Sequence, residues 1–176
     1  MNIDPFLLWV ENTALSRWLV ESISLLAFPG VLVLHAIGMG FAAGISVAFD
    51  LRVLGVAPQV PFSAMRRLFT VLWAGFWLNA ASGVLLIVAY PTKALTNPVF
   101  YLKLGLIAVG MVLVVRMGRE TLADEARQGG RPAVPLVASG RMRRLAIVSI
   151  VCWAGAVTAG RLLAYTYTRL TQTQVF

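Results

Sequence analysis

Four runs of mostly apolar residues, separated by shorter polar segments, account for most of this chain. They cover about residues 22–49, 68–90, 99–117 and 145–168. A helix that crosses a bilayer needs about 20 predominantly apolar residues, so each run predicts a transmembrane helix. The pattern therefore predicts one all-α membrane domain, residues 1–176, with four transmembrane helices in a bundle.

The segment before the first run has a different pattern. Residues 4–20 mix apolar positions with Glu11, Asn12 and Arg17, and Asp4–Pro5 is a typical helix start. This segment is too polar to span, so we predict an N-terminal amphipathic helix that lies at the membrane interface. We expect no cleavable signal peptide, because this end is acidic and the first apolar run begins only after residue 21.

The first apolar run is long and contains a stripe of small residues. As one helix its 28 residues would extend roughly 42 Å, which tilt or a kink at Pro29–Gly30 would accommodate. Ala36, Gly40, Gly44 and Ala48 recur every four residues. Such a stripe favours close helix packing, and it would also admit a flat cofactor.

The composition and charge agree with a membrane protein. The chain is 59% hydrophobic and 12% charged, against about 25% charged residues in soluble domains. Its net charge of +8 reports topology rather than nucleic-acid binding, because ten of the fifteen Lys and Arg residues flank the first and third connections. For a protein of the bacterial inner membrane, the positive-inside rule places both connections in the cytoplasm, including a predicted loop at 118–143. Both termini are then in the periplasm.

His35 is the only histidine, and it lies within the first apolar run. Ionisable residues inside a membrane are costly and commonly functional. Following the direction of each helix places His35 and Asn79 at mid-membrane, with Lys103 and Arg161 in the outer half. At the inner boundary we expect Asp50 to pair with an arginine at 66 or 67.

Three interpretations of His35 remain open. It is a haem axial ligand, with Arg161 and Lys103 near the propionates. It is a copper(I) ligand together with Met39, one turn further on. Or it bonds to Asn79 or a backbone carbonyl and only orients helices. Because the chain has a single histidine, bis-histidine ligation would require a second protomer or a partner.

Three motifs carry a resemblance to a known family. They are Leu34-His35 with Gly38 and Gly44 downstream, the DLRVLG sequence at 50–55, and the GRLLAY sequence at 160–165. With these motifs the chain resembles a family of small bacterial four-helix membrane proteins, itself loosely similar to membrane domains of copper-resistance proteins and to small b-type cytochromes. The resemblance implies the fold and the importance of His35, Asp50, Arg52 and Arg161, and it supplies no reaction. An aliphatic residue is usual in this family at position 39, which weakens the copper interpretation.

The leading hypothesis is a cofactor-holding membrane subunit for electron transfer, with haem b bound by His35, Arg161, Lys103, Asn79, Gly40 and Gly44. It is expected to act as a homo-oligomer or with a membrane or periplasmic redox partner. The alternatives are a non-catalytic scaffold subunit that docks through its glycine stripe, or a carrier of copper or a small solute.

Overall fold

The computed structural model describes residues 4–127 and 139–172. Over these ranges the chain forms seven helices and no strand: α1 (Asp4–Glu11), α2 (Ala14–Glu21), α3 (Phe28–Val53), α4 (Phe62–Ala89), α5 (Pro91–Leu95), α6 (Pro98–Arg127) and α7 (Gly140–Gln172). The four long helices α3, α4, α6 and α7 are each long and apolar enough to cross a membrane. The predicted four-helix membrane fold is confirmed.

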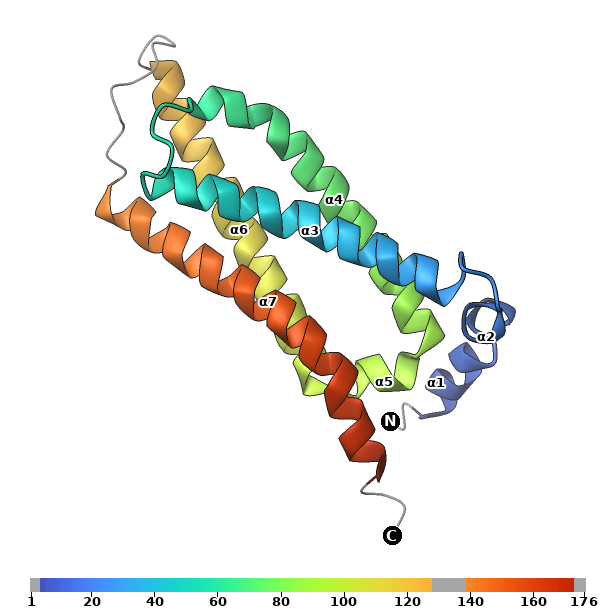
Figure 1. The fold of residues 1–176 in the computed structure, drawn as a ribbon. Helices are drawn as coiled ribbons and strands as arrows, with labels where there is room; N and C mark the ends of the chain where they lie inside the picture. Colours follow the sequence, from blue (N-terminus) through green and yellow to red (C-terminus); the bar gives the residue numbers. More distant parts are fainter. Residues whose placement is uncertain (1–3, 128–138, 173–176) are drawn as a thin grey trace.

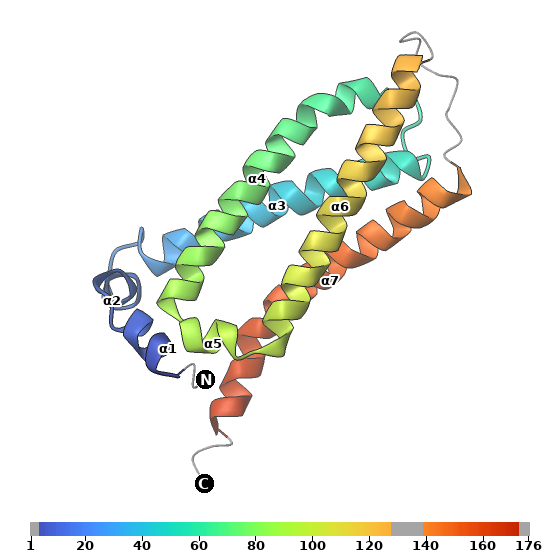
Figure 2. The same cartoon turned by 180° about the vertical axis from the view of Figure 1, so that it is seen from behind.

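The long helices form two antiparallel pairs, α3 with α4 and α6 with α7 (Figure 1). The two pairs meet mainly where α3 packs on α7. The short helices α1, α2 and α5 lie at the end of the bundle where the two chain termini are found, as the reverse view also shows (Figure 2). The connection from α3 to α4 lies at the opposite end.

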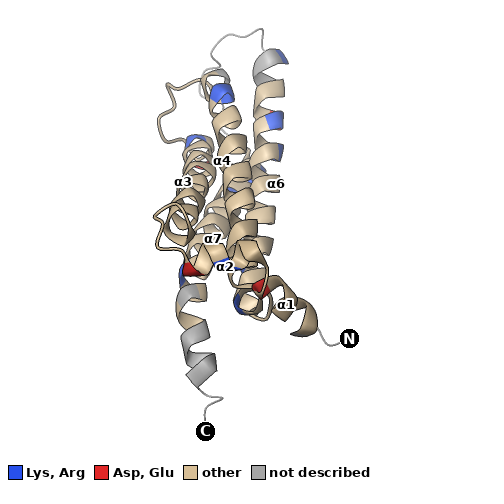
Figure 3. Ribbon diagram, turned by 90° about the vertical axis from the view of Figure 1, so that its right-hand side faces the viewer, with Lys and Arg blue, Asp and Glu red and all other residues tan. Residues whose placement is uncertain are grey.

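The outer surface of the bundle is apolar. In the apolar windows of the four helices only 17% to 33% of residues are buried inside the protein, so most of these side chains point outward. Such a surface suits lipid rather than water. Figure 3 shows Lys and Arg of α4 and α6 at the end away from the termini, with mostly uncharged helix between the two ends. The chain is thus a multi-pass membrane protein in architecture.

The first long helix begins later than the sequence pattern predicted. It starts at Phe28 rather than residue 22, and Pro29 stands in its first turn, where proline is tolerated, so no kink is needed. Before it, the side chains of Ser22 and Ser24 accept hydrogen bonds from the backbone two residues ahead, which favours a turn over helix. The other three long helices are longer than the predicted spans, at 62–89, 98–127 and 140–172.

The N-terminal segment is two helices instead of one. Helix α1 ends at Glu11, and Thr13 caps α2, because its hydroxyl oxygen accepts from the Ser16 amide at 3.3 Å. Both helices are tied to the rest of the fold: Thr92 of α5 donates to Glu11 at 2.7 Å, and the Ser16 hydroxyl donates to the Ala89 carbonyl at 3.5 Å. The segment remains amphipathic, with several apolar side chains exposed.

The predicted loop at 118–143 is wrong at both of its ends. Helix α6 continues to Arg127 and α7 begins at Gly140, so helix covers both ends of that range. Helix α6 thus continues beyond its candidate span, which ends at Ala123. Residues 128–138 of the predicted loop lie outside the described residues.

Candidate cofactor cavity at His35

The site depends on an unusually close approach of α3 and α4. A Cβ atom added to Gly38 would lie 2.6 Å from the backbone nitrogen of Asn79, and one added to Gly75 would lie 2.6 Å from the Cβ of Phe41. No real side chain fits at such distances, so the two glycines let the backbones touch. One turn before Gly38 on α3 is His35.

His35 and Asn79 make a reciprocal bridge across this contact. The His35 Nδ1 atom lies 3.0 Å from the Asn79 carbonyl oxygen, and the Asn79 amide donates to the His35 carbonyl oxygen at 2.8 Å. The imidazole also reaches the hydroxyl of Ser82 at 3.2 Å. Gly83 leaves room for the ring, since a Cβ there would lie 3.3 Å from the His35 Cε1 atom.

The other imidazole nitrogen faces a lysine. The Lys103 Nζ atom of α6 lies 3.1 Å from the His35 Nε2 atom. A lysine ammonium can only donate, so Nε2 accepts and the imidazole is neutral, with its proton on Nδ1. Nδ1 then donates to the Asn79 carbonyl and to the Ser82 hydroxyl, which itself donates to the Leu78 carbonyl at 2.6 Å. The ring is therefore held in one tautomer and one orientation.

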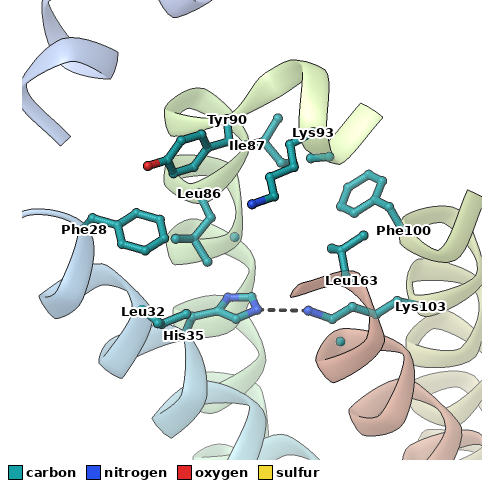
Figure 4. Close-up of a pocket in the computed structure, with 13 residues that line it drawn as sticks. Phe28, Leu32, His35, Leu86, Ile87, Tyr90, Lys93, Phe100, Lys103 and Leu163 are labelled. Carbon is teal, nitrogen blue, oxygen red and sulfur yellow. Dashed lines mark hydrogen bonds between the residues drawn. The ribbon is translucent and has the colours of Figure 1, made fainter. Parts of the chain in front are cut away.

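A cavity of about 440 Å³ opens beside this pair (Figure 4). It lies between the two helix pairs at the end of the bundle that carries the termini, with His35 and Lys103 on one side and Tyr90 and Lys93 on the other. Its walls are mostly apolar, with Phe28, Leu32, Leu86, Ile87, Phe100 and Leu163 among the lining side chains. The size is in the range of small-molecule and cofactor sites, about 300–1,000 Å³.

The charged side chains that line the cavity are all basic. Lys93 and Lys103 line it, and no carboxylate belongs to the lining formed by the described residues. The Lys93 Nζ atom also lies 5.5 Å from the centre of the Tyr90 ring. Apolar walls with two cations and an imidazole suit a flat or chain-like molecule that has an anionic or electron-pair-donating head.

The structure brings together three of the predicted site residues, His35, Asn79 and Lys103. Because α3 begins at Phe28, His35 lies only about 10 Å along the helix, nearer its start than mid-span. The prediction that His35 lies at mid-membrane is therefore wrong: along α3 it lies nearer the end of the bundle that carries the termini.

The other predicted residues lie elsewhere. Gly40 and Gly44 face outward, with nothing within 4 Å of an added Cβ. Arg161 is exposed on α7, where its guanidinium lies 5.8 Å from the Tyr165 ring centre, and it does not line the cavity. Met39 is partly buried against the core that includes Phe49 and Leu72.

The sequence analysis missed Ser82 and Lys93. A weak signal existed for Ser82, which follows Asn79 by three residues and so shares its helix face. Lys93 gave no such signal, because only the folding of α5 over the cavity brings it near His35.

No protein-family model, curated protein or solved structure matches this chain.

Proposed function

We propose that this chain is a membrane subunit that holds haem b, with His35 as an axial ligand, and serves electron transfer. The observation that carries the proposal is the orientation of the imidazole. Its Nδ1 atom donates to the Asn79 carbonyl, and its Nε2 lone pair points to Lys103 at the cavity. A metal-ligating histidine usually donates from one nitrogen to a carbonyl or carboxylate and ligates through the other, and here Nε2 would become available once Lys103 moves away from it.

The two lysines support the same occupant. The propionates of haem b are carboxylates, and Lys93 and Lys103 reach the cavity from separate elements, α5 and α6. Lys103 must leave Nε2 for iron to bind there, and its flexible four-carbon stem allows this movement. Released from the imidazole, its ammonium would pair with a propionate. Lys93 thus takes the place that the sequence analysis gave to Arg161.

Within the described lining, His35 is the residue that would ligate the haem iron. No methionine, cysteine or second histidine belongs to it, so the other axial position would be open or filled from a partner. Haem bound through one histidine supplies one-electron chemistry and small-ligand binding. The chain itself would fix the imidazole, neutralise the propionates and exclude water with its aromatic walls. Copper held by His35 and Met39 is less well supported, since Met39 packs partly buried against the main core and does not belong to the lining of the cavity that contains His35.

Titration with ferric haem tests the proposal. Protein produced under haem limitation and purified in mild detergent should bind one haem per chain, with a Soret band. His35→Ala should weaken binding by more than the roughly 10–100-fold that follows loss of a ligand's hydrogen-bond partner, and Ser82→Ala should fall within that range. Arg161→Gln is the matched control and should bind as wild type. Equal binding by wild type and His35→Ala would refute the assignment.

The membrane and orientation belong to the same proposal. The excess of Lys and Arg at the end away from the termini supports a bacterial inner membrane with both termini in the periplasm. The cavity would then lie in the periplasmic half, where a homo-oligomeric or periplasmic redox partner would meet it. Alkaline phosphatase fused to the C-terminus should be active, and green fluorescent protein at the same place should be dark.

A second candidate is a non-catalytic scaffold subunit. The observation that favours it is that the whole stripe of Ala36, Gly40, Gly44 and Ala48 is exposed on the outer face of α3. In that case Gly40→Leu or Gly44→Leu should break assembly with a partner, and His35→Ala should leave assembly and partner activity intact. The haem proposal instead predicts that His35→Ala loses the cofactor and that Gly40→Leu and Gly44→Leu retain it.

A further inference from the structure

A second polar site lies at the other end of α3. Asp50 is in the last turn of that helix, fifteen residues or roughly 22 Å from His35, and it is completely buried. Nearby positions of α3 and α7 are apolar and buried: Phe49, Val53 and Ala146 belong to the main hydrophobic core. This acid has no part in the proposed cofactor site.

The carboxyl of Asp50 and a serine of α7 both lack satisfied hydrogen bonds among the described residues. Ser149 of α7, also completely buried, lies next to the Asp50 side chain. Yet neither carboxyl oxygen, nor the Ser149 hydroxyl, has a hydrogen bond of ordinary geometry among the described residues. Ser46, one turn before Asp50, is already engaged, since its hydroxyl donates to the Ala42 carbonyl at 2.7 Å.

The expected arginine partners point elsewhere. Arg52 on the same helix donates to the carbonyls of Val60 and Pro58 at 2.6 and 2.9 Å, and its guanidinium lies over the Phe62 ring. The basic side chains at this end of the other packed helices are all exposed: Arg66 and Arg67 of α4, Arg116 and Arg119 of α6, and Arg141, Arg143 and Arg144 of α7. The predicted ion pair of Asp50 is therefore absent from the described part of the chain.

These observations limit the state of the carboxyl. An ionised carboxylate without donors, enclosed by apolar side chains, is strongly disfavoured. A metal cation would need more oxygen ligands than one carboxylate and one free hydroxyl provide. A neutral carboxylic acid has one donor and one acceptor, and so does the hydroxyl of Ser149, so the two groups complement each other.

We propose that Asp50 and Ser149 form a buried proton-binding site between α3 and α7, in which Asp50 carries a proton in the folded protein. The proton comes from water and is held on a carboxyl oxygen, and the Ser149 hydroxyl exchanges a hydrogen bond with the acid. Loss of the proton would leave an unpaired charge where the two helix pairs meet. Ionisation and loosening of the α3–α7 contact are therefore linked, and raising the pH favours both.

Infrared spectroscopy of the protein in lipid bilayers tests this site. Wild type at neutral pH should show the carbonyl stretch of a protonated carboxylic acid, with a shift on exchange into D₂O. Asp50→Asn should lose the band, and the exposed control Glu21→Gln should keep it. Ser149→Ala should keep the band at higher frequency, because the carbonyl loses its hydrogen-bond partner.

A second measurement keeps the test decisive if Asp50→Asn does not fold. Incorporation of ¹³C-aspartate into wild type labels only three residues, Asp4, Asp50 and Asp124, and should shift the band. A wild-type spectrum that shows only ionised carboxylate at neutral pH would overturn the proposal. So would a band that disappears when sodium replaces potassium, because a bound cation would then occupy the site.

Discussion

The close contact of Gly38 with α4 makes a sharp prediction. In Gly38→Ala the new Cβ would lie 2.6 Å from the Asn79 nitrogen and 2.8 Å from the Gly75 oxygen, and both are backbone atoms that cannot turn aside. Restoring an ordinary contact of 3.4 Å requires α4 to move by about 0.8 Å. Overpacking of this kind costs about 1–3 kcal/mol, and better helix propensity returns at most about 1 kcal/mol. We expect a net loss of about 1–2 kcal/mol in the free energy of unfolding.

Gly40 provides the matched control, two residues further along the same helix. Nothing lies within 4 Å of a Cβ added there, so Gly40→Ala should be as stable as wild type or gain up to about 1 kcal/mol. Reversible unfolding by SDS in mixed micelles, followed by circular dichroism, gives both values. The reasoning is refuted if Gly38→Ala is as stable as Gly40→Ala. A loss in Gly40→Ala that depends on protein concentration would indicate that the exposed stripe contacts another molecule.

Three further predictions concern polar contacts. Asn79→Ala removes an interhelical amide hydrogen bond of 2.8 Å and should lower the free energy of unfolding by about 0.6–2 kcal/mol in the same assay; an unchanged value would contradict the bridge. Arg52→Lys loses a fork that binds two loop carbonyls and should cost about 1–2 kcal/mol, whereas the exposed Arg66→Lys should stay within about 0.5 kcal/mol. Thr92→Val removes the hydroxyl that donates to Glu11 at 2.7 Å, so amide hydrogen exchange should become faster in α1 than in wild type and remain unchanged in α6. The same exchange rates in α1 of the variant and of wild type would argue against a stabilising role of this hydrogen bond.

The number and order of the spanning helices could be predicted, because about 20 consecutive apolar residues have few other uses. The ends were less predictable. The side chains of Ser22 and Ser24 accept hydrogen bonds from the backbone, so α3 begins only at Phe28. Helix α6, in contrast, continues through charged residues to Arg127. Such local effects are weak beside the hydropathy signal. The hydropathy pattern alone therefore predicts too early a start for α3 and too early an end for α6.

The candidate site was predictable where helix direction determines depth. That reasoning put His35 and Asn79 at one depth, and the structure brings them into contact. It put Lys103 and Arg161 further outward; Lys103 reaches His35, whereas Arg161 is exposed and does not line the cavity. It failed for the glycines, because α3 is apolar on all sides and its sequence does not show which face meets α4. The facing pair is Gly38 with Gly75, and the more regular stripe at Gly40 is exposed.

The pairing of Asp50 was also mispredicted, for a different reason. Sequence proximity to the membrane boundary favoured a salt bridge with Arg66 or Arg67, but both arginines are exposed and the acid is buried. The side on which a helix carries its charge depends on its rotation in the bundle, which a run of apolar residues leaves undetermined.

The visible absorption spectrum, oxidised and then reduced with dithionite, tests the central claim most directly. Wild type, expressed with ample haem and purified in mild detergent, should show a Soret band and reduced α and β bands. His35→Ala should lose these bands while retaining its helical circular dichroism. A folded, colourless wild type, or an unchanged spectrum in His35→Ala, would contradict the role assigned to His35.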